Sequence, residues 1–267
     1  MYFKNLEDKC LYYRGLVDYK LMPNSYVMVS LDGRGFSKAI KNKFKKPFDN
    51  DFINMMNETA KYLCNNIEGC KFAYVQSDEI SLVITDFDTP TTDTFFGNRI
   101  CKLQSIIASM ASGKFNQLMI LYRMKCGMSI NPEDVIENCP VYQFDCRCWN
   151  VPAFNDVFAY FLWRQIDCVR NSKQQSAQTY FPHKELLGKS TDEQIKKLLD
   201  EKGIDWNQYN DGEKYGRFIW KRKVLMNNIE TGELYQRNKW EVSPAFYLVE
   251  DEGREKFFNL GVIPLQS

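Results

Sequence analysis

The feature that most constrains this chain is the placement of acidic residues at the ends of apolar runs. Asp32 follows the run 25–31, and Asp78 lies in the turn 76–79 between two further apolar runs. Runs rich in β-branched and aromatic residues predict strands, and the second pair of runs predicts a hairpin with acids at its turn. If the first strand lies beside this hairpin, Asp32 and Asp78 meet at one edge of a sheet.

Two converging carboxylates indicate a cation site. Unit charges about 4 Å apart repel by about 4 kcal/mol at an effective dielectric constant of about 20, so packing alone does not favour the arrangement. A divalent cation between the two carboxylates turns the repulsion into attraction. Oxygen ligands suit Mg²⁺, which takes one or two carboxylates plus substrate phosphates. The alternative is ordinary turn chemistry, because Asp before Gly is common in turns and acidic turns are usually solvated. The conjunction of the two sites favours the metal.

Composition and charge restrict the classes of protein. The 267 residues are 44% hydrophobic and 15% aromatic, enough for one large domain or two small ones. The 35 basic and 34 acidic residues nearly cancel, so nucleic-acid contacts would come from local patches. Nine cysteines without zinc-ligand spacing predict reduced thiols. The mixed-charge start and the lack of a long apolar run predict a cytoplasmic protein with no membrane contact.

The order of elements predicts an α+β fold. A basic stretch ends at Pro47, and Asp49 is placed to cap a helix with one apolar face. After the hairpin, a second helix is expected from Thr94 and a further strand over 141–149. Strand-helix-strand-strand-helix-strand is the pattern of a palm-like, ferredoxin-type sheet with helices on one face. The predicted helix-face residues are Phe52, Met55, Met56, Ala60 and Leu63 for the first helix, and Ile100, Leu103, Ile107 and Met110 for the second.

The second part of the chain is expected to be an appendage. We predict a palm-like domain over 1–152 and a C-terminal extension over 153–267 that packs on it. The extension begins with a helical apolar stripe, continues with a short charged helix over 190–202, and ends with β-rich sequence over 215–249.

The loop after Asp32 is suited to phosphate. In Asp32-Gly33-Arg34-Gly35-Phe36 the glycines permit close backbone approach and can present N–H groups to phosphate oxygens, although the same loop is also compatible with a plain tight turn. An acid at the first strand and another at the central hairpin is the layout of palm-type polymerases and nucleotidyl cyclases, which use two metals about 3.5–4 Å apart. Arg99 and Lys102 share a helix face, and Lys46 precedes the first helix; solvated helix faces would also explain these cations.

Several stretches together resemble the tRNA-histidine guanylyltransferase family. The resemblance covers nearly the first 190 residues. It implies a palm-like enzyme with two Mg²⁺ ions that adds nucleotides to the 5′ end of tRNA, with ATP and GTP as substrates, and a homotetrameric dimer of dimers. The matching stretches are Leu-Met-Pro-Asn at 21–24, Leu-Asp-Gly-Arg-Gly-Phe at 31–36, Phe-Lys-Lys-Pro at 44–47, Ala-Tyr-Val-Gln-Ser-Asp-Glu-Ile-Ser at 73–81 and Trp-Arg-Gln-Ile-Asp at 163–167.

The resemblance also implies roles for single residues. Asp32, Asp78 and the Gly33 carbonyl would be metal ligands, and Glu79 would support the acidic site as a third catalytic residue. Lys46, Arg99 and Lys102 match basic positions tied to the triphosphate and to activation of the 5′ end. The nucleotide-binding residues implied in this way are Asp32, Gly33, Arg34, Gly35, Phe36, Ser37, Lys46, Ser77, Asp78, Arg99 and Lys102.

One stretch departs from the eukaryotic members of that family. They carry His-Ile-Asn-Asn-Leu-Tyr-Asn after the Trp-Arg-Gln helix, whereas residues 169–175 here are Val-Arg-Asn-Ser-Lys-Gln-Gln. This version is similar to the guanylyltransferase-like branch, whose members repair 5′-truncated tRNA by templated 3′–5′ addition. Arg170, Asn171 and Lys189 are the expected RNA contacts, and a solvated helix face is the alternative for them.

Two other functions are compatible with the same residues. A palm-type nucleotide cyclase would share the metal site and attack intramolecularly. A non-catalytic tRNA-binding protein would use the basic patches around Lys43 and Arg170, and its binding would depend on salt but not on Mg²⁺.

Overall fold

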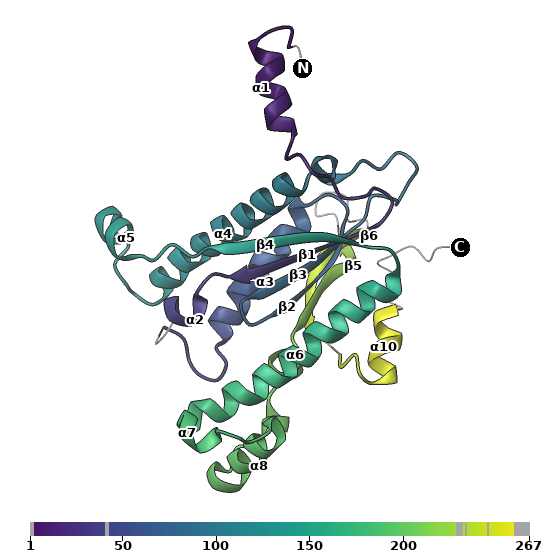
Figure 1. Cartoon of the computed structure of the whole chain (residues 1–267). Coiled ribbons are helices and arrows are strands. Elements are labelled where there is room, and N and C mark those ends of the chain that lie inside the picture. The colour runs from purple at the N-terminus through teal and green to yellow at the C-terminus, as the bar shows by residue number, and fades with distance from the viewer. Residues whose placement is uncertain (1–2, 41–42, 228–231, 233, 245, 259–267) are drawn as a thin grey trace.

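One six-stranded antiparallel sheet organises the computed structural model, which describes residues 3–40, 43–227, 232, 234–244 and 246–258 (Figure 1). The strand order is β4-β1-β3-β2-β5-β6. The strands are β1 Tyr26–Gly33, β2 Cys70–Gln76, β3 Glu79–Ile84, β4 Phe144–Val151, β5 Arg217–Asn227 and β6 Leu234–Pro244.

Helices of very different lengths connect and cover these strands. Three are long enough to cross the sheet or its edge, namely α3, α4 and α6. The α-helices are α1 Leu6–Gly15, α2 Phe36–Ala39, α3 Asn50–Asn66, α4 Ile100–Lys125, α5 Pro132–Asn138, α6 Phe154–Tyr180, α7 His183–Leu186, α8 Thr191–Lys202, α9 Asp211–Lys214 and α10 Asp251–Phe258. The 3₁₀ helices are η1 Phe95–Asn98 and η2 Trp206–Gln208.

The first four strands and two helices confirm the predicted palm-like order. β1, α3, β2, β3, α4 and β4 follow one another as strand-helix-strand-strand-helix-strand, and α3 and α4 lie on one face of the sheet (Figure 1). Asp49 caps α3, because its side chain accepts hydrogen bonds from the N–H groups of Asp51 and Phe52. Leu63 on α3 and Leu103 on α4 are fully buried in the core against this face.

The opposite face of the sheet is covered by α6 and α10. The ring of Phe161 on α6 lies 4.8 Å from that of Phe72 on β2, and Phe257 on α10 packs against both. Successive side chains of each strand point to opposite faces of the sheet, so the strands contribute to two cores, one under α3 and α4 and one under α6. This second core makes the C-terminal extension part of the same folded body as the palm.

Two expected boundaries were wrong. The second helix begins at Ile100 and not at Thr94, because Phe96, Gly97 and Asn98 have positive φ values that interrupt a helix. The fourth strand begins at Phe144 and not at 141. The backbone of Tyr142 exchanges hydrogen bonds with the Asn116 side chain on α4, which takes that residue out of strand pairing.

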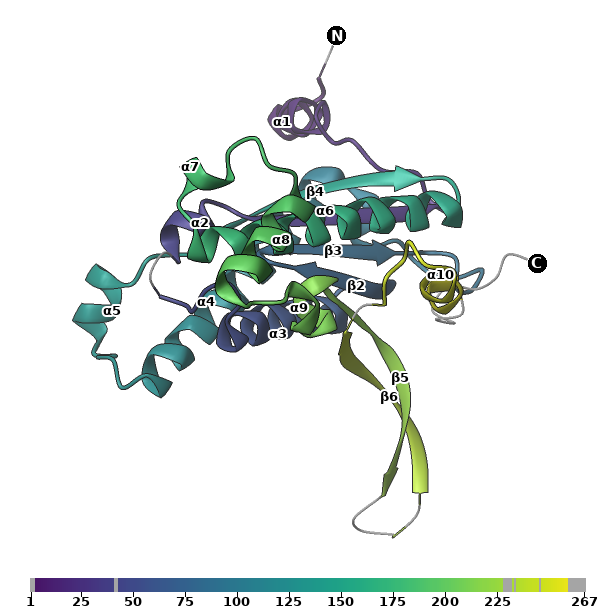
Figure 2. The same cartoon turned by 90° about the horizontal axis from the view of Figure 1, so that it is seen from below.

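The β-rich C-terminal sequence forms a hairpin that continues the palm sheet. β5 pairs with β2 from Phe72↔Trp220 to Val75↔Arg217, so the predicted parts 1–152 and 153–267 share one sheet. Beyond Trp220 the β5–β6 hairpin extends away from the body (Figure 2). Within the described part of the chain, no helix combines the length and apolar character needed to cross a membrane.

Candidate functional site

The structure brings the two predicted acidic segments together. Asp32 near the end of β1 lies opposite Glu79 at the start of β3, and the N–H of Gly33 donates to the carbonyl oxygen of Asp78 at 3.2 Å. Asp78 occupies the two-residue turn between β2 and β3 with Ser77, whose φ is +43°. The first strand and the hairpin are therefore neighbours at the end of the sheet, as the sequence pattern predicted.

Neither acid has a cationic partner within hydrogen-bonding distance. Burial and then the charge of Asp32 raise the pKa of Asp78 to about 6, against hydrogen bonds that lower it. The pKa of Asp32 is raised by partial desolvation and by the charge of Asp145, which lies opposite Asp32 on the neighbouring strand β4. No ion pair is formed by Asp32 or Asp78 with any described residue. Within the described part of the chain, Arg147 and Arg164 act on Asp32 only through charge at longer range, so no hydrogen-bonded cation offsets the negative charge of the pair.

These acids fit a divalent cation that is completed by its substrate. Among the described residues, no group of three or more His, Cys, Asp or Glu side chains is arranged as a complete metal cage. Mg²⁺ commonly takes only one or two carboxylates and receives its other ligands from phosphates and water. Asp32 and Asp78, with backbone carbonyl groups beside them, offer that kind of partial oxygen site.

Glu79 has a different environment from the other two acids. Arg164 on α6 donates to both Glu79 oxygens at 2.9 and 2.8 Å, and Gln76 donates to one of them at 2.8 Å. Arg164 also pairs with Asp167 at 2.9 Å. This network offsets the charge of Glu79 and links the turn end of the hairpin to α6. Glu79 therefore contributes to the position of the turn that carries Asp78.

The glycine loop is required by the packing behind it. A Cβ at Gly33 would lie 2.6 Å from the ring of Phe36, and Gly35 has a φ of +64°. Phe36 is buried against Phe115 and Tyr142, and it meets the cleft described next only as part of its wall. The aromatic anchor thus holds the loop against the sheet.

A cleft of about 410 Å³ lies between the palm and α6 and reaches Asp78. It brings several predicted nucleotide-binding residues together, namely Phe36, Ser37, Lys46, Ser77 and Asp78, and it also includes Asn171. Its α6 wall carries amides that sequence reasoning did not find: Gln174, Gln175 and Gln178. Gln175 donates to the carbonyl oxygen of Pro47 at 2.6 Å and so links this wall to the Lys46 segment.

Other predicted residues lie elsewhere. Arg99 precedes α4, and its side chain pairs with Asp18 at 2.6 Å. Its backbone forms an isolated antiparallel β-bridge with Lys20 in the segment before β1. Because β1 runs from that segment toward Asp32, Arg99 and the nearby Lys102 lie at the opposite end of the sheet (Figure 1). Within this chain they do not line the cleft.

The remaining predicted contacts are exposed and do not line the cleft. Arg34 is exposed and donates to the side chain of Gln143 at 2.9 Å. Arg170 on α6 pairs with Asp167, and its side chain remains 60% exposed. Lys189 is exposed just after α7.

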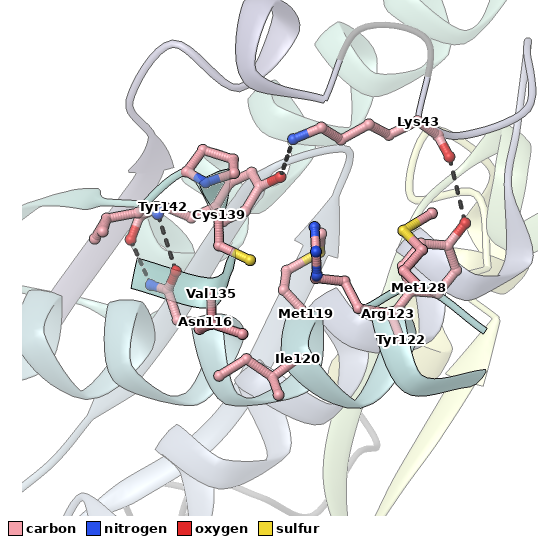
Figure 3. A pocket seen from close by; sticks show the side chains of 12 residues that line it. Lys43, Asn116, Met119, Ile120, Tyr122, Arg123, Met128, Val135, Cys139 and Tyr142 are labelled. Atoms are coloured by element: carbon pink, nitrogen blue, oxygen red, sulfur yellow. Dashed lines mark hydrogen bonds between the residues drawn. The ribbon is translucent and has the colours of Figure 1, made fainter. Parts of the chain in front are cut away.

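A second cavity, of about 370 Å³, lies between α4, α5 and the segment before β4 (Figure 3). Lys43 donates to the Tyr142 hydroxyl at 2.9 Å on its rim, and Met119 and Val135 contribute apolar lining. None of the residues predicted for metal or nucleotide binding lines this cavity. The cleft beside Asp78 is therefore the candidate site.

Fold and site define a palm-like nucleotidyltransferase, and comparison with known proteins identifies its family. The model of the family described as "Thg1: tRNAHis guanylyltransferase" matches residues 3–152, and the chain belongs to this family. A bacterial tRNA(His) guanylyltransferase (Thg1)-like protein, solved in complex with ATP, is 34% identical and superposes with a TM-score of 0.79 over 95% of this chain and 98% of its own. Its counterpart structure in complex with GTP is 30% identical, with a TM-score of 0.76 over 97% and 99% of the two chains.

Sequence relatives agree with this assignment. An uncharacterized protein, R259, of Acanthamoeba polyphaga mimivirus is 28% identical over 84% of this chain and 79% of its own length. The tRNA(His) guanylyltransferase of Debaryomyces hansenii is 29% identical over 74% of both chains.

Proposed function

We propose that this enzyme adds nucleotides in the 3′–5′ direction to the 5′ end of tRNA, in a reaction that depends on Mg²⁺. The observation that carries the proposal is the convergence of two acids, Asp32 and Asp78, neither of which forms an ion pair with a described residue; Asp78 lines a cleft that also contains Lys46. The similar bacterial structures, solved in complex with ATP and with GTP, support nucleoside triphosphates as substrates.

The chemistry proceeds by two displacements at phosphorus. An oxygen of the tRNA 5′-monophosphate attacks the α-phosphorus of ATP, an anhydride bond forms, and pyrophosphate leaves with the electrons of the broken bond. The 3′-hydroxyl of the incoming nucleotide then attacks the activated 5′ phosphorus and loses its proton to water. A phosphodiester forms and AMP leaves; when the RNA starts with a 5′-triphosphate, pyrophosphate leaves instead.

The residues of the chain position these groups. Asp32 and Asp78 would hold Mg²⁺, which when bound supplies positive charge to the phosphoryl oxygens. The N–H groups of the glycine loop and the ammonium group of Lys46 would orient the triphosphate. Ser37 and Ser77 offer hydroxyl groups on the cleft side of that loop. Positioning and charge compensation account for most of the catalysis in phosphoryl transfer.

The sequence of α6 supports templated repair of 5′-truncated tRNA over strict addition of one G. Residues 169–175 lack the stretch of the eukaryotic enzymes, and three glutamines of that helix line the cleft. We further propose a homotetramer, supported by α1, which has no buried residue and extends from the body (Figure 1). All nine thiols are free, which supports a reducing cytoplasm.

The test is nucleotide addition to the 5′ end of a tRNA transcript that lacks its first nucleotide and carries a 5′-monophosphate. With ATP, labelled GTP and Mg²⁺ we expect one-nucleotide addition, and none with EDTA. Asp32→Asn and Asp78→Asn should each reduce the rate by about 10³-fold, in the range seen when a transition-state charge partner is removed. Asp200→Asn, on the exposed side of α8, is the matched control and should retain the rate.

Two results would contradict this function. Formation of a cyclic nucleotide without RNA would assign the site to a cyclase. Tight tRNA binding that is indifferent to Mg²⁺ and to Asp32→Asn, with no extension of any transcript, would assign the chain to RNA binding alone.

A further inference from the structure

Trp163 on α6 is an aromatic side chain that remains largely open to solvent, one residue before the Arg164 that pairs with Glu79. It is 58% exposed, whereas its helical neighbours Arg164 and Gln165 are 8% and 0% exposed. It does not line the cleft that contains Lys46. A single exposed apolar residue is ordinary on a protein surface, so the surroundings of this ring decide its significance.

The indole is held in a defined orientation by a packed series of side chains. The Arg164 guanidinium carbon lies 4.4 Å from the ring centroid of Trp163, and the ring of Tyr160 lies 5.8 Å away at 60°. Arg164 is itself fixed by Glu79, and the Tyr160 hydroxyl is within 3.0 Å of the Ser81 hydroxyl. The ring is therefore ordered before any ligand arrives, and little side-chain entropy remains to be lost on binding.

This ring lies on the side of α6 that faces β4 and the acidic pair. Tyr160, which contacts Trp163, also packs against Trp149 on β4 at 5.2 Å. Arg164 joins Trp163 to Glu79, and Glu79 lies directly opposite Asp32 in the sheet. Asp78 lines the cleft, whereas Asp32 is exposed and does not line it; the open surface is the solvent-exposed surface formed by α6 at Trp163 and by β4.

The open surface has the charge of a nucleic-acid path. Arg147 on β4 and Arg170 on α6 are exposed on the two elements that flank it; the charge of Arg147 acts on Asp32, and Arg170 pairs with Asp167. Proteins that hold single-stranded nucleic acid combine cations for the backbone with aromatic rings on which bases stack. A reaction between a triphosphate and an RNA end needs a place for each substrate, and we assign the triphosphate to the cleft.

We propose that Trp163 is the stacking platform for a nucleobase at the 5′ end of the RNA acceptor, and that it holds this end beside Asp32 and Asp78. The inference rests on the proposed function, because it assigns the second substrate of that reaction to a surface. Stacking is tolerant of sequence, since every base has a π face, which suits an enzyme that acts on ends of different sequence.

Binding of the truncated 5′-monophosphorylated tRNA transcript tests this assignment. We expect Trp163→Ala to weaken its Kd by about 5- to 100-fold, the range of one base–aromatic stack, while the Kd for GTP stays unchanged. Trp163→Phe should retain most of the affinity because phenylalanine still offers a ring. Ile166→Ala is the matched control: Ile166 is 50% exposed three residues along the same helix and should bind the transcript normally.

Fluorescence provides a readout that does not depend on catalysis. The chain has five tryptophans, and we expect the transcript to quench the emission of the unmodified protein but to lose most of this effect with Trp163→Phe. Equal quenching in both proteins, or wild-type affinity in Trp163→Ala, would overturn the stacking role even if nucleotide addition is observed. A change of oligomeric mass in Trp163→Ala would instead assign the ring to contacts between subunits and also overturn it.

The proposed function can fail separately. An unmodified protein that extends no transcript would remove the nucleotide-addition activity, while quenching that requires Trp163 would still establish the stack.

Discussion

Two hairpins of the same sheet differ sharply in how they are buried. The β2–β3 hairpin lies at the centre of the sheet, and nearly all of its residues are buried between α3 on one face and α6 on the other. The β5–β6 hairpin starts in the same way, with Phe218 and Ile219 fully buried, but its residues beyond Trp220 are mostly exposed (Figure 2).

The contrast shows that strand pairing determines the backbone geometry of a hairpin, whereas burial determines the electrostatic environment of its side chains. Both hairpins pair as antiparallel ladders, with one register shift between Cys70 and Phe72 in β2. At the turn of the β2–β3 hairpin, burial raises the pKa of Asp78 to about 6. The projecting hairpin presents Lys221, Arg222 and Lys223 to water, where charge is easily accommodated.

The largest expected difference between the hairpins is in stability. Leu82 on β3 is fully buried, and we expect Leu82→Ala to lower the free energy of unfolding by about 2–5 kcal/mol, through lost burial and the cavity left behind. Urea denaturation followed by circular dichroism measures this change. A loss below about 1 kcal/mol would mean that the central hairpin is not held by its core, contrary to the comparison.

The same distinction explains how much of the site could be predicted from the sequence. Asp32 and Asp78 each follow from an apolar run that ends in an acid, and this local pattern survives folding because strand ends meet at sheet edges. The order of the palm elements follows from the same runs. The buried position of Phe36 was not predicted, because its loop was interpreted from the glycines alone.

Positions that depend on the direction of a helix could not be predicted in this way. The spacing of Arg99 and Lys102 predicts a shared helix face, but Arg99 precedes α4, and the spacing does not show at which end of the sheet α4 begins. The amides of Gln174 and Gln178 follow no motif, and only the packing of α6 over the hairpin places them in the cleft. Trp163 was part of a matched motif, yet its exposure depends on which side of α6 faces solvent.

The second prediction uses the charge of Asp78 in the β2–β3 turn. A carboxyl group with a raised pKa stabilises the folded state in its protonated form, and this contribution is complete below about pH 4 and lost as the pH rises through about 6. A pKa raised from 3.8 to about 6 corresponds to about 3 kcal/mol. We therefore expect Asp78→Asn, which cannot ionise, to raise the free energy of unfolding by up to about 3 kcal/mol at pH 7.5 in EDTA.

Measuring urea midpoints at both ends of this pH range checks the sign. The variant and the unmodified protein should differ at pH 7.5 and converge near pH 4, because the aspartate is then neutral as well. Asp200→Asn on the exposed face of α8 controls for the loss of one negative charge. A variant less stable than the unmodified protein at pH 7.5 would show that the Asp78 carboxylate stabilises the turn, and that burial there carries no electrostatic cost.

The smallest effect is expected at the projecting hairpin. Leu225 on β5 is 63% exposed and lies opposite Gln236 on β6, so Leu225→Ala removes little buried surface. We expect the free energy of unfolding to change by no more than about 0.5 kcal/mol, the usual range for surface substitutions. The same urea titration used for Leu82→Ala measures it, which makes the two leucines a matched pair on one sheet. A loss at Leu225 as large as that at Leu82 would mean that the hairpin is buried against another molecule in solution, and the comparison between the two hairpins would then hold only for the isolated chain.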